Sequence, residues 1–205
     1  MSKINLMRSG AVAAAALVAV SGSSLFAQNA GRSNVRGSVI SASATSLKVK
    51  SREGKVVDVA LADGWKITSL ARSSVAAIKP GDFVGIASTK NAKGDRALEV
   101  LIFPPALKGL GEGSYGWDLK PQSSMTNASV TSKVKGVNGQ TVSLSYSGGQ
   151  KNITIPPSAP VVTFAPATSA DLKPGARVFV GAEVAGGKLV AHQVVVGKNG
   201  VVPPM

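Results

Sequence analysis

The feature that most constrains the fold of this chain is an internal repeat. Residues 78–84 read IKPGDFV, and residues 172–178 read LKPGARV at an offset of 94 positions (172 minus 78). The same offset aligns ALEVLI at residues 97–102 with AHQVVV at residues 191–196. Because one offset holds across two separate segments, the chain is expected to contain one structural unit twice.

Each copy has the residue pattern of a small β-unit. In the first copy, apolar and polar residues alternate at 47–50 and 57–61 around a turn at 52–55, and a second hairpin pattern covers residues 83–103. The second copy repeats this order of strands and turns. Short helical turns are expected only before the two Lys-Pro-Gly motifs, at residues 73–78 and 168–172. These patterns predict an all-β fold of two tandem small OB-like β-barrels related by internal duplication.

The predicted organisation follows from these patterns. It comprises a signal peptide at 1–27, a first β-barrel repeat at 35–104, a connector at 105–127, a second β-barrel repeat at 128–198 and a C-terminal tail at 199–205. The connector is rich in Gly, Pro and Ser but contains Trp117, one of two tryptophans in the chain. We therefore expect it to pack between the repeats instead of acting as a tether.

The first residues predict export from the cytoplasm. Lys3 and Arg8 precede an apolar run at 11–20 and a small-residue stretch that ends near Ala27. The apolar run is shorter than the ~20 residues that a membrane-spanning helix needs. The sequence therefore predicts a periplasmic or secreted protein that is not transmembrane once the signal is removed. The chain has no cysteine, so disulfides, thiol catalysis and thiolate metal sites are excluded.

The charge of the chain is strongly positive. The formal net charge is +13, and removal of Lys3 and Arg8 with the signal leaves +11. Such a balance favours an anionic neighbour, such as a membrane surface or an acidic envelope polymer, although it also serves solubility. One dense group of cations alternates with apolar residues as the solvent face of a strand would, and it is a possible surface binding site: Lys48, Lys50, Arg52 and Lys55.

The residues that support chemistry are few. His192 is the only histidine, and Glu183 on the preceding predicted strand is expected to form a cross-strand pair with it. Zinc usually takes three or four protein ligands, so this pair predicts no metal site. The carboxylates are scattered, and the chain lacks a Gly-x-Ser-x-Gly motif. No catalytic residue, cofactor or enzymatic activity is predicted, and the aromatic content of 4% argues against nucleic-acid binding.

Several short motifs together resemble a known family. They are VDVALAD at 57–63, IKPG at 78–81, VGIAS at 84–88, GWDL at 116–119 and MTNA at 125–128. The chain resembles small exported proteobacterial proteins of unknown function that carry two tandem OB-like periplasmic β-barrel repeats. Some members bear the label of metal transporter permease, which conflicts with the lack of membrane helices expected here. The family has no established active site, so the resemblance implies no catalytic residue.

Together these observations predict a function in binding. We expect a non-enzymatic exported binding or scaffold protein with two barrels, whose ligand is an anionic envelope component or an envelope protein. The alternative is a soluble accessory protein of a metal-handling or transport system, or an uncharacterised enzyme. Only Glu183, His192 and the permease label of the family favour that alternative.

Overall fold

The computed structural model describes residues 31–136 and 139–204. The predicted signal peptide at 1–27 lies outside the described residues. Within the described ranges, no helix is long and apolar enough to cross a membrane.

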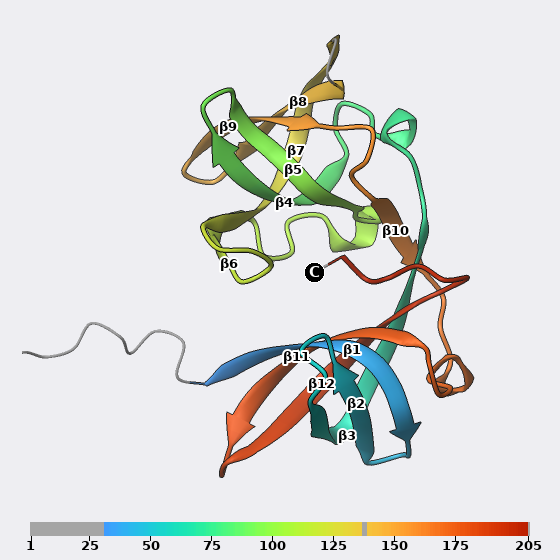
Figure 1. Cartoon of the computed structure of the whole chain (residues 1–205). Coiled ribbons are helices and arrows are strands. Elements are labelled where there is room, and N and C mark those ends of the chain that lie inside the picture. The colour runs from blue at the N-terminus through green and yellow to red at the C-terminus, as the bar shows by residue number, and fades with distance from the viewer. Residues whose placement is uncertain (1–30, 137–138, 205) are drawn as a thin grey trace, which may run out of the picture. The chain divides into compact units, whose positions relative to one another are not determined.

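The described chain is built from strands, which confirms the predicted all-β class (Figure 1). The strands are β1 (Arg32–Ala42), β2 (Ser46–Ser51), β3 (Val56–Arg72), β4 (Phe83–Asn91), β5 (Gly94–Ile102), β6 (Gly113–Trp117), β7 (Ser123–Gly136), β8 (Gly139–Tyr146), β9 (Gly149–Ile155), β10 (Val161–Ala165), β11 (Arg177–Ala185) and β12 (Lys188–Gly197). Helical structure is limited to three single 3-10 turns: η1 (Val75–Ala77), η2 (Pro105–Leu107) and η3 (Ser169–Asp171). Two of these turns lie where the sequence predicts them.

The repeat offset reappears in the element boundaries. Strand β4 begins at Phe83 and β11 at Arg177, an offset of 94 (177 minus 83). The same offset separates η1 at Val75 from η3 at Ser169 (169 minus 75). The 3-10 turn and the strand that follows it therefore have counterparts at the same points of the second copy.

The first barrel, which we term the β1 barrel, closes through five strands. Strands β1, β2 and β3 form an antiparallel meander, β11 pairs antiparallel with β1, and β12 pairs with β11. A parallel pairing of β12 with β3, from Leu189 opposite Val59 to Gly197 opposite Leu70, completes the ring. This small closed barrel agrees with the predicted OB-like architecture.

The second barrel, which we term the β7 barrel, has the same pattern. Strands β7, β8 and β9 form the meander, and β4 pairs antiparallel with β7. Strand β5 pairs with β4 and closes the ring by a short parallel contact with β9, at Asp95 opposite Ile153 and Arg96 opposite Thr154. Strand β6 adds an antiparallel partner at the start of β7.

The two copies exchange their closing hairpins. The β1 barrel takes β1–β3 from the first copy and β11–β12 from the second, while the β7 barrel takes β7–β9 from the second copy and β4–β5 from the first. Figure 1 shows the blue and teal strands β1–β3 beside the orange and red strands β11 and β12. Neither segment 35–104 nor segment 128–198 therefore closes a barrel with its own strands in this structure, which differs from the predicted division.

Strand β3 runs past Trp65 to Arg72 without a break and pairs at its end with β10. The backbone of β3 is irregular at Gly64, whose φ of +70° suits glycine. The pairing of β3 with β12 shifts register in the same region.

The two Lys-Pro-Gly turns join the copies symmetrically. The backbone N–H of Gly81 donates to the carbonyl of Val130 at 2.8 Å, and that of Gly175 donates to the carbonyl of Val39 at 2.8 Å. Both glycines have positive φ, +91° at Gly81 and +84° at Gly175, where other residues are strained. Each repeated motif therefore attaches to the meander of the opposite copy.

Three apolar clusters hold the described residues together. One fills the β1 barrel around Val49, and a second fills the β7 barrel around Ile86, with both side chains fully buried. The third contains residues of both barrels: Leu70, Leu101, Val162, Phe179, Val195 and Val201. Burial of such side chains contributes roughly 1.5–3 kcal/mol each, so the third cluster stabilises the contact between the barrels.

The predicted connector at 105–127 is structured. It contains η2, β6 and the first residues of β7. Trp117 on β6 is partly buried and packs against the third cluster, with its ring centroid 6.4 Å from that of Phe179 on β11. The connector therefore touches strands of the β1 barrel as well as its own.

Engineered disulfides test the strand exchange. Arg32 lies opposite Glu183 in the β1–β11 ladder, and both side chains are exposed. The chain has no natural cysteine, so we expect the double substitution Arg32→Cys and Glu183→Cys to form a disulfide under mild oxidation, visible as a shift in gel mobility without reductant. The matched control is Arg32→Cys with Thr89→Cys, because Thr89 is the first-copy counterpart of Glu183 (183 minus 94). A control pair that cross-links better than the test pair would contradict the exchange.

Candidate functional site

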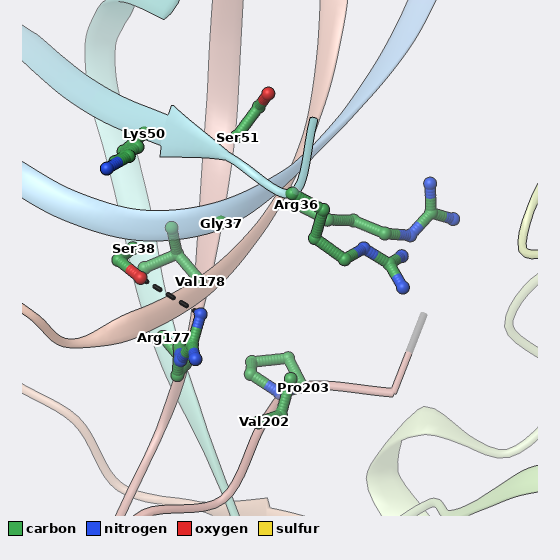
Figure 2. A pocket seen from close by; sticks show the side chains of 10 residues that line it. Arg36, Gly37, Ser38, Lys50, Ser51, Arg177, Val178, Val202 and Pro203 are labelled. Atoms are coloured by element: carbon green, nitrogen blue, oxygen red, sulfur yellow. Dashed lines mark hydrogen bonds between the residues drawn. The ribbon is translucent and has the colours of Figure 1, made fainter. Parts of the chain in front are cut away.

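A basic pocket lies on the β1 barrel beside the C-terminal segment. Its volume is about 550 Å³. The lining residues come from β1, β2, the following turn, the start of β11 and the tail, and they are Arg36, Gly37, Ser38, Lys50, Ser51, Arg52, Arg177, Val178, Val202 and Pro203. Figure 2 shows Arg177 joined to Ser38 by a hydrogen bond, with Val202 and Pro203 below them.

The alternation of the hairpin strands puts these side chains outside the barrel. Val35 and Val39 of β1 and Val49 of β2 point into the barrel and are buried, so Arg36 and Lys50 face outwards. Glycine at position 37 is required for the close pairing of the strands. A Cβ built there would lie 2.1 Å from the backbone oxygen of Lys50.

The lining of the pocket is cationic. Its charged side chains are Arg36, Lys50, Arg52 and Arg177, and no acidic residue lines it. Arg177 donates from Nη1 to the Ser38 hydroxyl at 3.0 Å. Within the described residues, no salt bridge compensates Lys50, Arg52 or Arg177. The pocket therefore presents a net positive charge to an anion, although the exposed Glu53 carboxylate acts on Arg52 and Arg36.

Arg36 forms one wall and also joins the barrel to the connector. Its guanidinium donates to both carboxylate oxygens of Asp118, at 2.9 Å from Nη1 and 2.6 Å from Nη2. The same group lies over the rings of Trp117 and Phe179, 5.6 Å and 5.2 Å from their centroids. The hydrogen bonds from Arg36 hold the pKa of Asp118 below its ordinary value. This geometry fixes the Arg36 side chain in place.

A buried carboxyl is under the electrostatic influence of two of these arginines. Glu99 on β5 is 4% exposed, and its Oε1 has no hydrogen-bond partner among the described residues. Burial raises the pKa of the Glu99 carboxyl to about 8, and the charges of Arg36 and Arg52 oppose this rise. Glu99 is therefore largely protonated and neutral at pH 7.

On the corresponding face of the β7 barrel, the described residues differ from the arginines of the basic pocket. Arg177 is replaced there by Phe83 (177 minus 94), which is buried. The β1–β2 ladder shifts register after Val39, and the β7–β8 ladder shifts after Val130. When these two points are aligned, Asn127 is the counterpart of Arg36. The Asn127 side chain donates to the Tyr115 hydroxyl at 3.2 Å, so the connector covers this face. The two copies thus differ at positions that supply arginines to the pocket.

The predicted binding residues are only partly brought together. Lys50 and Arg52 line the pocket. Lys48 faces solvent on the same strand and forms an ion pair with Asp58 at 3.3 Å, while Lys55 is exposed but does not line the pocket. Sequence reasoning missed Arg36 and Arg177, although the arginine in LKPGAR at the position of phenylalanine in IKPGDF is a signal for Arg177.

The predicted pair of Glu183 and His192 lies on the β11–β12 hairpin. Glu183 is opposite Val190 in the ladder, two residues before His192, and both side chains are exposed. No ion pair joins them in the structure as described. In the same residues, no group of three or more His, Cys, Asp or Glu side chains is placed to hold a metal ion.

Comparisons of the chain with protein-family models, with curated proteins and with solved structures find no match.

Proposed function

We propose that the protein is a non-enzymatic exported binding protein that holds an anionic envelope polymer at the basic pocket of the β1 barrel. The observation that carries this proposal is the set of lining cations without a compensating salt bridge: Lys50, Arg52 and Arg177. Uncompensated cations in a concave site focus the field on an incoming anion. The exported location rests on the signal pattern at 1–27.

A polymer suits this site better than a flat membrane surface. The cations line a concavity instead of a plane, and Val202 at its edge is the only large apolar side chain of the lining that is exposed. Lys55 lies on the same hairpin outside the pocket, where it extends the positive surface along a bound chain, whereas the charge of Lys48 is offset by its ion pair with Asp58.

Charge removal at the pocket tests the proposal. The variant carries Lys50→Gln, Arg52→Gln and Arg177→Gln, and the probe is dextran sulfate, measured by calorimetry at low salt. At about 1 kcal/mol for each cation near an anionic surface, we expect affinity to fall about 100-fold. Binding by the unmodified protein is expected to weaken steeply as salt rises.

The matched control removes three exposed lysines elsewhere: Lys93→Gln, Lys120→Gln and Lys173→Gln. Lys133 is unsuitable as a control because its ammonium donates to the carbonyls of Val75, Ala76 and Ile78. Equal losses of affinity in the two variants would show that only net charge matters, and would overturn the assignment of binding to the pocket. Binding to phosphatidylglycerol vesicles but not to the polymer would replace the polymer with a membrane surface.

A further inference from the structure

The inference rests on the proposed function and concerns the anionic group that the pocket takes. Two of the three uncompensated cations, Arg52 and Arg177, are arginines, whose planar guanidinium matches the oxygens of phosphate and sulfate in bidentate contacts. Ser38 adds a hydroxyl on the same wall. A single carboxylate would neutralise only one of the three charges, whereas a dianion with several acceptor oxygens neutralises more.

Glu99 is the internal acid that acts on the same arginines. Its side chain is almost fully buried on β5, and its Oε1 lacks a hydrogen-bond partner. Among the described residues, the charged groups that act on it are Arg36 from β1 and Arg52 from the turn after β2, and both line the pocket. Asp118 already occupies Arg36 through two hydrogen bonds. The charge of Arg52 is therefore shared among Glu99, the exposed carboxylate of Glu53, whose pKa it helps to lower, and whatever enters the pocket.

We propose that the pocket binds the dianionic group of a phosphate monoester, and that the Glu99 carboxylate competes with this group for the charge of Arg52. When Glu99 is neutral, it no longer offsets the charge that Arg52 presents to the ligand. When Glu99 is ionised, its negative charge repels the ligand and offsets part of the positive field. Binding of the ester and release of the Glu99 proton are therefore antagonistic, and the coupling is reciprocal.

The direction of the pH dependence follows from the Glu99 carboxyl. Burial raises its pKa to about 8, so affinity is high below this pH and falls as the pH rises through it. The smallest coupling usually measured between sites corresponds to about five-fold in affinity. We expect a loss of about this size between pH 6 and pH 9.

Inorganic sulfate is the probe for the test, because it remains a dianion across this range. Its dissociation constant is measured at both pH values by NMR of the arginine side chains, with sodium chloride added to hold the ionic strength constant. In Glu99→Gln, which imitates the neutral acid, we expect the pH dependence to vanish and the affinity to match that of the unmodified protein at low pH. The matched controls Glu183→Gln and His192→Gln lie outside the pocket lining and are expected to keep the pH dependence.

A second measurement does not depend on a variant. The carboxyl ¹³C signal of Glu99 is titrated with and without saturating sulfate, and the bound anion is expected to raise the apparent pKa. An unchanged pKa, or a pH dependence that survives Glu99→Gln, would overturn the role of Glu99 while the proposed function stands. Binding of dextran sulfate through the pocket without saturable binding of sulfate would overturn the dianion site alone. Absence of binding for both probes would overturn the proposed function as well.

Discussion

Two fragments produced by cutting the chain at Leu110 are expected to co-purify as one complex when they are co-expressed. Leu110 is 57% exposed in the bend between η2 and β6, so the cut removes little local structure. The pairings of β1 with β11, β3 with β12, β4 with β7 and β5 with β9 all join one fragment to the other. Size-exclusion chromatography is expected to show a single 1:1 species with the circular dichroism of the intact protein.

Self-closure of the second fragment is disfavoured by the residues that differ between the copies. If β11 closed the β7 meander, Arg177 would occupy the position of Phe83 (177 minus 94). Phe83 is 3% exposed and packs on Phe103 with ring centroids 5.3 Å apart. Burial of an unpaired guanidinium there costs several kcal/mol, which favours the exchanged arrangement over two independent barrels.

A control separates failed assembly from a wrong topology. A protease site placed at Leu110 in the intact chain allows cutting after folding. The cut protein is expected to stay together in native buffer and to separate only in denaturant. Two fragments that elute as separate folded monomers after this treatment would contradict the exchange.

The strands, turns and fold class were predictable from the sequence, but the exchange of hairpins between the two copies was not. Local alternation and the Lys-Pro-Gly motifs predicted the hairpins, the turns and the β class, because these depend on neighbours in sequence. The exchange was not predictable in this way. The hairpins β4–β5 and β11–β12 have the same topology, so either one satisfies the pattern of either meander. The choice between them depends on long-range packing, such as that of Phe83 on Phe103.

Two of the four cations of the candidate site were predictable from the sequence, because only these two depend on local strand alternation alone. Lys50 and Arg52 are close in sequence, and strand alternation was enough to place them on one outer face. Arg177 reaches this face only because β11 pairs with β1, on the other side of the strand exchange. Glu99 stands in the apolar run ALEVLI, and a polar residue in such a strand is informative only when both faces of the strand are known to be covered.

The burial of Glu99 also predicts how stability depends on pH, whether or not a ligand binds. Burial raises the pKa of its carboxyl from 4.5 to about 8 in the folded protein. Between these values the folded state holds a proton that the unfolded state releases, so the free energy of unfolding falls as the pH rises. Below the lower value both states are protonated, and above the upper value both are ionised, so the contribution of Glu99 is constant outside this window.

In Glu99→Gln this loss is expected to disappear. A rise in pKa from 4.5 to about 8 corresponds to roughly 5 kcal/mol at about 1.4 kcal/mol per unit. The variant is therefore expected to unfold at a similar denaturant concentration to the unmodified protein near pH 5, and to be more stable by up to about 5 kcal/mol near pH 9. Urea unfolding followed by fluorescence across this range measures the difference. The control Glu183→Gln, at an exposed position, is expected to follow the unmodified protein throughout, and parallel curves for all three proteins would show that Glu99 is solvated and ordinary.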